Sequence, residues 1–284
     1  MRKYMSITVL LLGLTMCLLM VGTAQAGFLS SAYEGQVGAV VAAYPTSGSN
    51  GPGTLSVGGL PVGANILSAT LYAENYFSSP TITATFAGST LGNGSKFASD
   101  GSLQGYRWDV TSLVAGNGNY SATYAGAANT YGLALAVVYS SPSLASNGRV
   151  EILAGAFDIC GGQGGCSATS QFTNFGAGAG TLWIRTGADN ALGQSNESIN
   201  LNGIQVGGPI DANLGDYASL FNLSVGVVSG TNSININSPQ GDQFDWNLAV
   251  LYGRSSSTAV PEPATMLLLG LGLVGLAGAR RLKK

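Results

Sequence analysis

The feature that most limits the fold of this chain is a series of short alternating segments. Each is rich in Val, Leu, Tyr, Ala and Thr and is bounded by Gly or Asn, as is typical of β-strands joined by tight turns. The clearest of them lie at 66–73, 81–86, 106–114, 119–124 and 131–139. An apolar segment such as 133–139 needs a packing layer on both of its faces. The sequence therefore predicts an all-β protein.

The pattern of segments occurs twice. The stretch LAVVY at 135–139 returns as LAVLY at 248–252, and WDVT at 108–111 has an echo in FNLS at 221–224. Trp108 lies 27 residues before Leu135, and Phe221 also lies 27 residues before Leu248. Two upstream pairs keep the same order: TLY at 70–72 with TLW at 181–183, and FAG at 86–88 with LNG at 201–203. We predict repeat units at about 66–142 and 178–254.

Two such units can be arranged in two ways. One is a single antiparallel two-sheet sandwich, jelly-roll-like and built from two similar, intertwined halves. The other is a pair of sandwiches in tandem, with the loop 160–166 at the junction. A unit of about 70 residues is small for burying such apolar strands alone, which favours the single body.

The N-terminus has the layout of a secretory signal peptide over residues 1–26. Arg2 and Lys3 provide the positive region, 7–21 the apolar region, and Ala24-Gln-Ala26 a cleavage site of small residues. Signal peptidase is therefore an expected partner, and the body would begin at Gly27. Cys17 follows Met16, where a lipid-attachment box requires a small residue, so a lipoprotein is the minor alternative.

The C-terminal segment 258–284 predicts a membrane tether. Its apolar run, 264–279, is a candidate transmembrane helix of roughly 24 Å at about 1.5 Å per residue. That length is a little below the roughly 30 Å of a bilayer core. The motif Pro261, Glu262 and Pro263 comes before the run, and a basic cluster that begins with Arg280 and Arg281 follows it. Such a cluster stays on the cytoplasmic side, so the body would face outward.

These tail residues closely resemble the PEP-CTERM sorting signal of Gram-negative bacteria. The resemblance implies handling by an exosortase-type enzyme near Pro261-Glu262-Pro263, a transient stay in the inner membrane, and transfer to the cell surface or extracellular matrix of a bacterium that makes exopolysaccharide. An ordinary single-span anchor is the alternative. Segments 106–114 and 132–139 also resemble a family of secreted β-rich surface domains of unknown function, which implies a fold but no activity.

The charge of the predicted body, 27–257, limits its partners. It holds five basic and twelve acidic residues, a formal net charge of −7. Such a surface has no basic patch to neutralise phosphates, so nucleic acid is not expected as a partner. Exopolysaccharide or protein fits better.

The residue types also exclude several chemistries. The chain has no histidine, which excludes Ser-His-Asp and Cys-His catalysis and zinc sites that use imidazole. Cys160 and Cys166, in the stretch CGGQGGC, would form a disulfide in an oxidising compartment. A redox or metal role is the minor alternative. No cofactor is expected.

Three further groups of residues could carry a site. The candidate carboxylates for glycosidase chemistry are Asp109, Asp242 and Asp245, although Asp109 and Asp242 also fit turns. Asp211, Asn213 and Asp216 form a weak calcium candidate, since the stretch departs from the usual loop pattern and also fits a surface turn. The aromatic residues that could stack on sugars, or belong to the core, are Tyr72, Tyr76, Trp183 and Trp246.

The expectation is a non-enzymatic, secreted surface or extracellular-matrix protein associated with exopolysaccharide. The alternatives are a carbohydrate-active enzyme and a carbohydrate-binding module of the same matrix.

Overall fold

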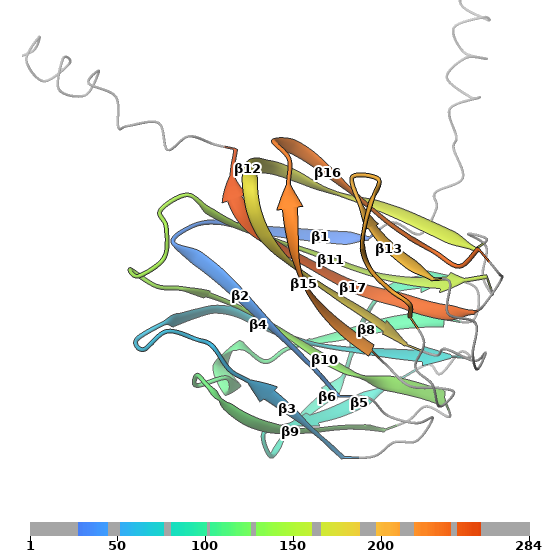
Figure 1. Ribbon diagram of the computed structural model, residues 1–284. Coiled ribbons are helices and arrows are strands. Elements are labelled where there is room, and N and C mark those ends of the chain that lie inside the picture. Colours follow the sequence, from blue (N-terminus) through green and yellow to red (C-terminus); the bar gives the residue numbers. More distant parts are fainter. Residues whose placement is uncertain are drawn as a thin grey trace, which may run out of the picture.

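The computed structural model describes residues 28–44, 52–76, 81–100, 103–125, 129–160, 166–187, 197–210, 219–239 and 243–256. Within these ranges the chain forms seventeen strands and one 3-10 turn, η1 (Thr111–Leu113), which confirms the all-β class (Figure 1). In this part of the chain no helix has the length and apolar character needed to cross a membrane. The predicted signal peptide, 1–26, and the predicted helix, 264–279, lie outside the described residues.

The first half of the chain is a sandwich of two antiparallel sheets. The inner sheet has the order β2 (Val37–Tyr44), β10 (Asn129–Ser140), β4 (Asn65–Tyr76), β8 (Leu103–Asp109) and β7 (Ser95–Asp100). The outer sheet has the order β3 (Gly53–Val57), β9 (Gly118–Ala125), β5 (Thr83–Phe86) and β6 (Ser89–Asn93). Alternate residues of the two sheets, among them Leu71, Phe86 and Leu135, meet in one buried cluster. This period of two is what the alternating sequence predicts.

The second half uses one eight-stranded sheet for both of its layers. The order is β1 (Leu29–Gly35), β11 (Gly148–Ile159), β17 (Phe244–Ser255), β12 (Ser167–Gly187), β16 (Gly230–Asn237), β13 (Ser198–Leu201) and β14 (Ile204–Gly207), with β15 (Ser219–Val227) also paired to β12. The strand β12 is 21 residues long: 167–175 pairs with β16, and 178–186 pairs with β15. Phe172 from the first part and Leu182 from the second lie in the same core. One continuous strand therefore serves both layers.

Apart from the edge strands β1 and β7, the strand pairing of the two halves is the same. The order β2-β10-β4-β8 in the first half corresponds to β11-β17-β12-β15 in the second, and β3-β9-β5-β6 corresponds to the first part of β12 followed by β16-β13-β14. This topological repeat covers 37–140 and 148–255, so it is longer than the sequence landmarks at 66–142 and 178–254. The repeated sequence motifs do not include the first strands of the two copies, because those strands have no motif in common.

The two inner layers pack face to face. Their shared core takes six residues from each half: Val37, Ala39, Tyr72, Ala134, Ala136 and Val138 from the first, and Val150, Ile152, Ala154, Trp183, Leu248 and Val250 from the second. These residues come from strands that correspond in the two halves, so the contact is close to symmetric. Figure 1 shows the second half (yellow to red) above the first (blue to green), with the N-terminal strand β1 in the upper group. The first described strand therefore belongs to the sheet of the second half.

The prediction of one jelly-roll-like body with two sheets is wrong. The described residues form three sheets, and the buried clusters separate four layers of strands. Along β10, Leu135 and Val137 face the core of their own sandwich, while Ala134 and Ala136 face the other half. A strand buried on both faces needs a layer on each side, and here the second layer is the inner sheet of the repeat.

Candidate functional site

Several predicted site residues lie outside the described part of the chain. They are the sorting-motif residues Pro261, Glu262, Pro263, Arg280 and Arg281, the calcium candidates Asp211, Asn213 and Asp216, and the carboxylate Asp242. Among the residues that the structure does describe, no group of three or more His, Cys, Asp or Glu side chains could hold a metal ion.

The predicted disulfide is confirmed. Cys160 and Cys166 are bonded to each other, with their Cα atoms 4.1 Å apart. The bond closes the loop between β11 and β12, where the first strand of the second half passes into the second. Its place at the start of the repeat indicates a structural role.

The two described carboxylates considered for glycosidase chemistry have different surroundings. Asp109 is exposed at the end of β8, where its Oδ1 accepts hydrogen bonds from the backbone N–H (2.9 Å) and hydroxyl (2.6 Å) of Thr111. These hydrogen bonds lower the pKa of Asp109 and hold the turn η1. Asp245 lies on β17 and is fully buried. A glycosidase needs both carboxylates to face the substrate, and these two do not.

The predicted aromatic residues are mostly core. Trp246 is fully buried and packs near Phe28, with ring centroids 4.3 Å apart, and Trp183 lies in the core between the halves. The side chain of Tyr76 is outside the described part. Tyr72 is also largely buried, but it lines a surface groove. Of the described residues in this group, only Tyr72 stays a candidate for contact with a sugar.

A buried ion pair joins the two halves. Arg185 of β12 donates a hydrogen bond of 2.5 Å from Nη1 to Oε2 of Glu74 on β4, and neither side chain is measurably exposed to solvent. Burial raises the pKa of Glu74, and the nearby guanidinium of Arg185 acts in the opposite direction. Breaking a pair of this kind leaves the remaining charge without compensation in a medium of low dielectric constant.

More acidic groups than basic ones surround this pair. Asp245 on β17 lies directly opposite Asp158 on β11, and like charges in that position repel. Burial, together with the charges of Glu74, Asp158 and Asp100, raises the pKa of Asp245 well above its usual range, against the attraction of Arg185. Neither carboxyl oxygen of Asp245 has a hydrogen-bond partner among the described residues. This cluster is closed to substrates, and from the raised pKa of Asp245 we expect the stability of the protein to depend on pH.

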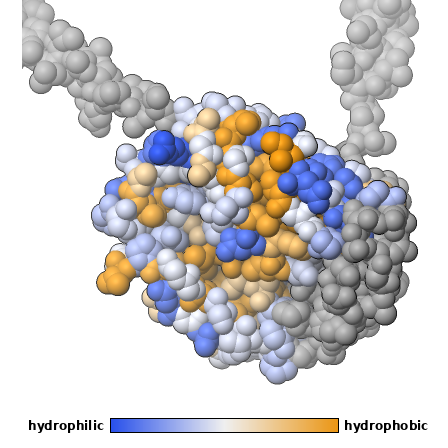
Figure 2. Space-filling model, viewed as in Figure 1, coloured by the Kyte–Doolittle hydropathy of each residue, from blue (hydrophilic) through white to orange (hydrophobic). Residues whose placement is uncertain are grey.

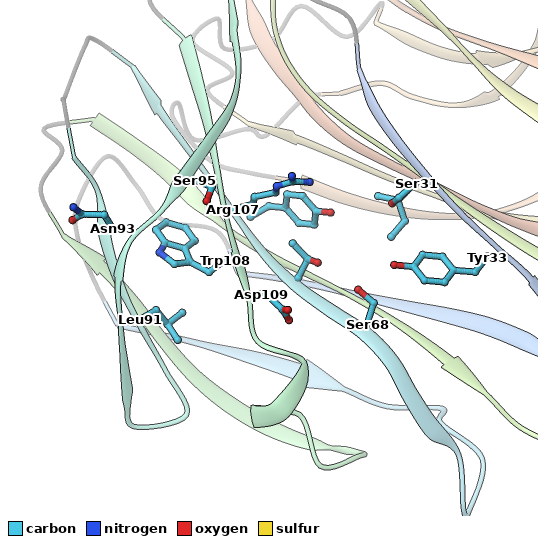
Figure 3. Close-up of a pocket in the computed structure, with 12 residues that line it drawn as sticks. Ser31, Tyr33, Ser68, Leu91, Asn93, Ser95, Arg107, Trp108 and Asp109 are labelled. Carbon is cyan, nitrogen blue, oxygen red and sulfur yellow. The ribbon is translucent and has the colours of Figure 1, made fainter.

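A polar groove opens where the halves meet (Figure 3). Its volume is about 540 Å³, within the range of sites for small ligands. One side is formed by Ser31 and Tyr33 of the edge strand β1, and the facing side by side chains of β4 and β8. On that facing side Tyr72 pairs with Arg107 and Thr70 with Asp109 across the two strands. The groove therefore depends on both halves.

The groove offers hydrogen-bonding groups of every kind. Hydroxyls of Ser31, Tyr33, Ser68 and Thr70 can donate and accept, Arg107 can only donate, and the ionised Asp109 can only accept. Among the described residues, no carboxylate forms an ion pair with Arg107. Burial raises the pKa of Tyr72 to about 12, so this phenol stays protonated at neutral pH.

Sequence reasoning did not find this groove. The spacing Ser68-x-Thr70-x-Tyr72 and Arg107-x-Asp109 places polar residues on one face of each strand, which is a readable signal. Nothing in the sequence shows that β4 pairs with β8 in this register, or that β1 lies across from them. The site depends on long-range pairing.

Comparisons with known proteins give one sequence match. Residues 259–281 match the PEP-CTERM protein-sorting motif. This match confirms the resemblance stated for the tail and supports an exosortase substrate directed to the cell surface. No curated protein matches the chain.

Three solved structures are each distantly similar to this chain. A conserved protein of unknown function from Pseudomonas aeruginosa PAO1, PA5104, is 10% identical over 76% of this chain and 99% of its own, with a TM-score of 0.31. The β-porphyranase BpGH86A of Bacteroides plebeius is 12% identical over 82% of this chain, with a TM-score of 0.26. The similar region is 37% of that enzyme, so this chain spans well under half of its length. The ANX2 ectodomain of Arabidopsis thaliana is 9% identical over 72% of this chain and 82% of its own, with a TM-score of 0.28.

The buried ion pair yields a first prediction. Replacing Arg185 with Met should lower the free energy of unfolding at pH 8 by about 3–5 kcal/mol, because Glu74 would be left buried and charged beside Asp245. Urea unfolding of the mature protein measures this. The matched control is Arg254→Met at an exposed position of β17, which should change stability by less than about 0.5 kcal/mol. Equal effects of the two substitutions would contradict the role given to the pair.

The raised pKa of Asp245 yields a second prediction. A carboxyl whose pKa is higher in the folded than in the unfolded state favours folding when protonated, and that contribution is lost as the pH rises. Asp245→Asn should therefore unfold at a higher temperature than the wild type at pH 8, and the advantage should shrink toward pH 4. Each kcal/mol gained corresponds to roughly 2–4 °C.

Asp109→Asn is the control for this second prediction, because the pKa of Asp109 is lowered. Its effect at pH 8 should have the opposite sign. At each pH, the melting temperature of Asp245→Asn is subtracted from that of the wild type. A difference that is larger at pH 8 than at pH 4 would contradict the raised pKa of Asp245.

Proposed function

We propose that the chain is a non-enzymatic protein of the cell surface or extracellular matrix that associates with exopolysaccharide after exosortase-type processing. The carrying observation is the sorting motif at 259–281, directly after an all-β body that ends with β17 at Ser255. A processing signal at this position would release the body without cutting into any described strand. The predicted signal peptide at 1–26 would bring the chain to the processing enzyme.

The character of the body supports a binding or structural role over catalysis. The chain has no histidine, Asp245 is fully buried, and Asp109 is engaged with Thr111. Charged residues are only 8% of the sequence, and Figure 2 shows apolar residues gathered over the centre and upper part of the viewed face with polar residues around them. The large apolar residues that are exposed in the described part lie in both halves: Leu29, Val62, Leu67, Ile204 and Val228. A body with so few charged residues and many Ser, Thr and Asn side chains suits a carbohydrate layer.

The tail can be tested separately from the body. Replacing Pro261-Glu262-Pro263 with three alanines keeps the apolar run and the basic residues, so a simple anchor should behave as before. We expect the variant to accumulate uncut in the inner membrane, whereas the wild type reaches the surface without peptides from 266–280. Mass spectrometry of both fractions measures the difference. Surface protein that still yields those peptides would contradict processing.

Association with polysaccharide has its own experiment. Mature protein collected from the surface is incubated with the exopolysaccharide of the producing strain and then sedimented with it. We expect co-sedimentation with no release of reducing ends. Release of reducing ends would favour a carbohydrate-active enzyme, and a protein that stays in the supernatant would contradict the association.

A further inference from the structure

The groove between the halves has the chemistry of a site for a neutral glycan. Its polar side chains come from five elements: Ser31 and Tyr33 from β1, Ser68, Thr70 and Tyr72 from β4, Asn93 from β6, Ser95 from β7, and Arg107 and Asp109 from β8. Sugar hydroxyls both donate and accept hydrogen bonds, and this lining offers both kinds of partner at close quarters. Figure 3 shows Tyr33 pointing from β1 toward the side chains on the facing sheet. A chain laid in the groove would meet polar groups on two sides.

Arg107 is the residue most suited to hold a ligand. The buried basic residues of the described part are already committed: Arg149 to Glu34 and Glu151, and Arg185 to Glu74. Arg107 is partly exposed in the groove, with no ion pair among the described residues. Its planar guanidinium can donate two hydrogen bonds to neighbouring hydroxyls from a fixed geometry.

The charge balance selects a neutral polymer over an acidic one. Arg107 and Asp109 are the charged residues of the lining, so its formal charge is zero. The body from 27 to 257 carries a formal net charge of −7, which repels a polyanion, most strongly at low salt. An acidic glycan would also place its carboxylates beside Asp109. Neutral sugar hydroxyls are repelled neither by the net charge of the body nor by the carboxylate of Asp109.

We propose that this groove binds a segment of neutral polysaccharide, with Arg107 and Tyr33 as the principal hydrogen-bonding residues. The proposal rests on the association with exopolysaccharide proposed above and assigns it to one surface. Because the two sides of the groove come from different halves, the packing of the halves sets its width. The site therefore depends on the packing of the two halves, although β1 itself lies outside both copies of the repeat.

The test uses surface-collected protein and two fractions of the producer's exopolysaccharide: the fraction that an anion exchanger does not retain, and the fraction that it retains. The wild type should co-sediment with the neutral fraction. Arg107→Gln should weaken this binding by about tenfold or more, and Tyr33→Phe by roughly three- to tenfold, as expected for a lost charged and a lost neutral hydrogen bond. Arg254→Gln, which removes an exposed charge outside the groove lining, should bind like the wild type. The thermal midpoint of each variant is measured to show that it is folded.

The outcomes separate this inference from the proposed function. Binding of the wild type to the acidic fraction alone, or equal binding by the wild type and Arg107→Gln, would overturn the site and leave the association with exopolysaccharide standing. A wild type that binds neither fraction would overturn both. Loss of binding in Arg107→Gln and Tyr33→Phe but not in Arg254→Gln supports the groove.

Discussion

The packing of the two inner sheets against each other is the contact on which the rest of the structure depends. It buries Ala134, Ala136 and Val138 on one side and Leu248 and Val250 on the other, and it gives β10 and β17 a covered second face. Small residues on β10 let the sheets approach closely, while Trp183 and Tyr72 fill the remaining space. Without this contact each sandwich would expose one apolar face. The contact also creates the buried Glu74–Arg185 pair and the groove lined by Tyr33 and Arg107.

The interface combines a favourable apolar part with an acidic part that opposes folding at neutral pH. Glu74, Asp158 and Asp245 are buried near one guanidinium, so burial and mutual repulsion raise the pKa of Asp245. Buried charges of this kind are a cost that apolar burial elsewhere must offset. The residues of this cluster are buried, whereas the lining of the groove includes the exposed Asp109 and the partly exposed Arg107. One packing event therefore produces a closed acidic cluster and an open polar site.

Local patterns in the sequence were enough for part of this structure. Alternation predicted the all-β class, the apolar stretch 133–139 predicted burial on both faces, and the spacing of Cys160 and Cys166 predicted their disulfide. The number of sheets was wrong because the repeat starts at β2, where the halves share no motif, so the unit looked too small to fold as a sandwich. The groove was missed because the pairing of Tyr72 with Arg107 and the position of Tyr33 are long-range facts. The sorting motif was recognised because its signal is local.

Hydrogen exchange of the surface-collected protein, with and without the neutral polysaccharide fraction, tests most directly the claim that the halves build the binding surface between them. The strand β1 is at the edge of its sheet, so many of its amides lack a strand partner and can report a bound chain. The account predicts slower exchange in peptides from β1 and from the β7–β8 region, and no change in the β13–β14 hairpin, which lies at the other end of that sheet. Slower exchange at β13–β14 with none at β1 would contradict it.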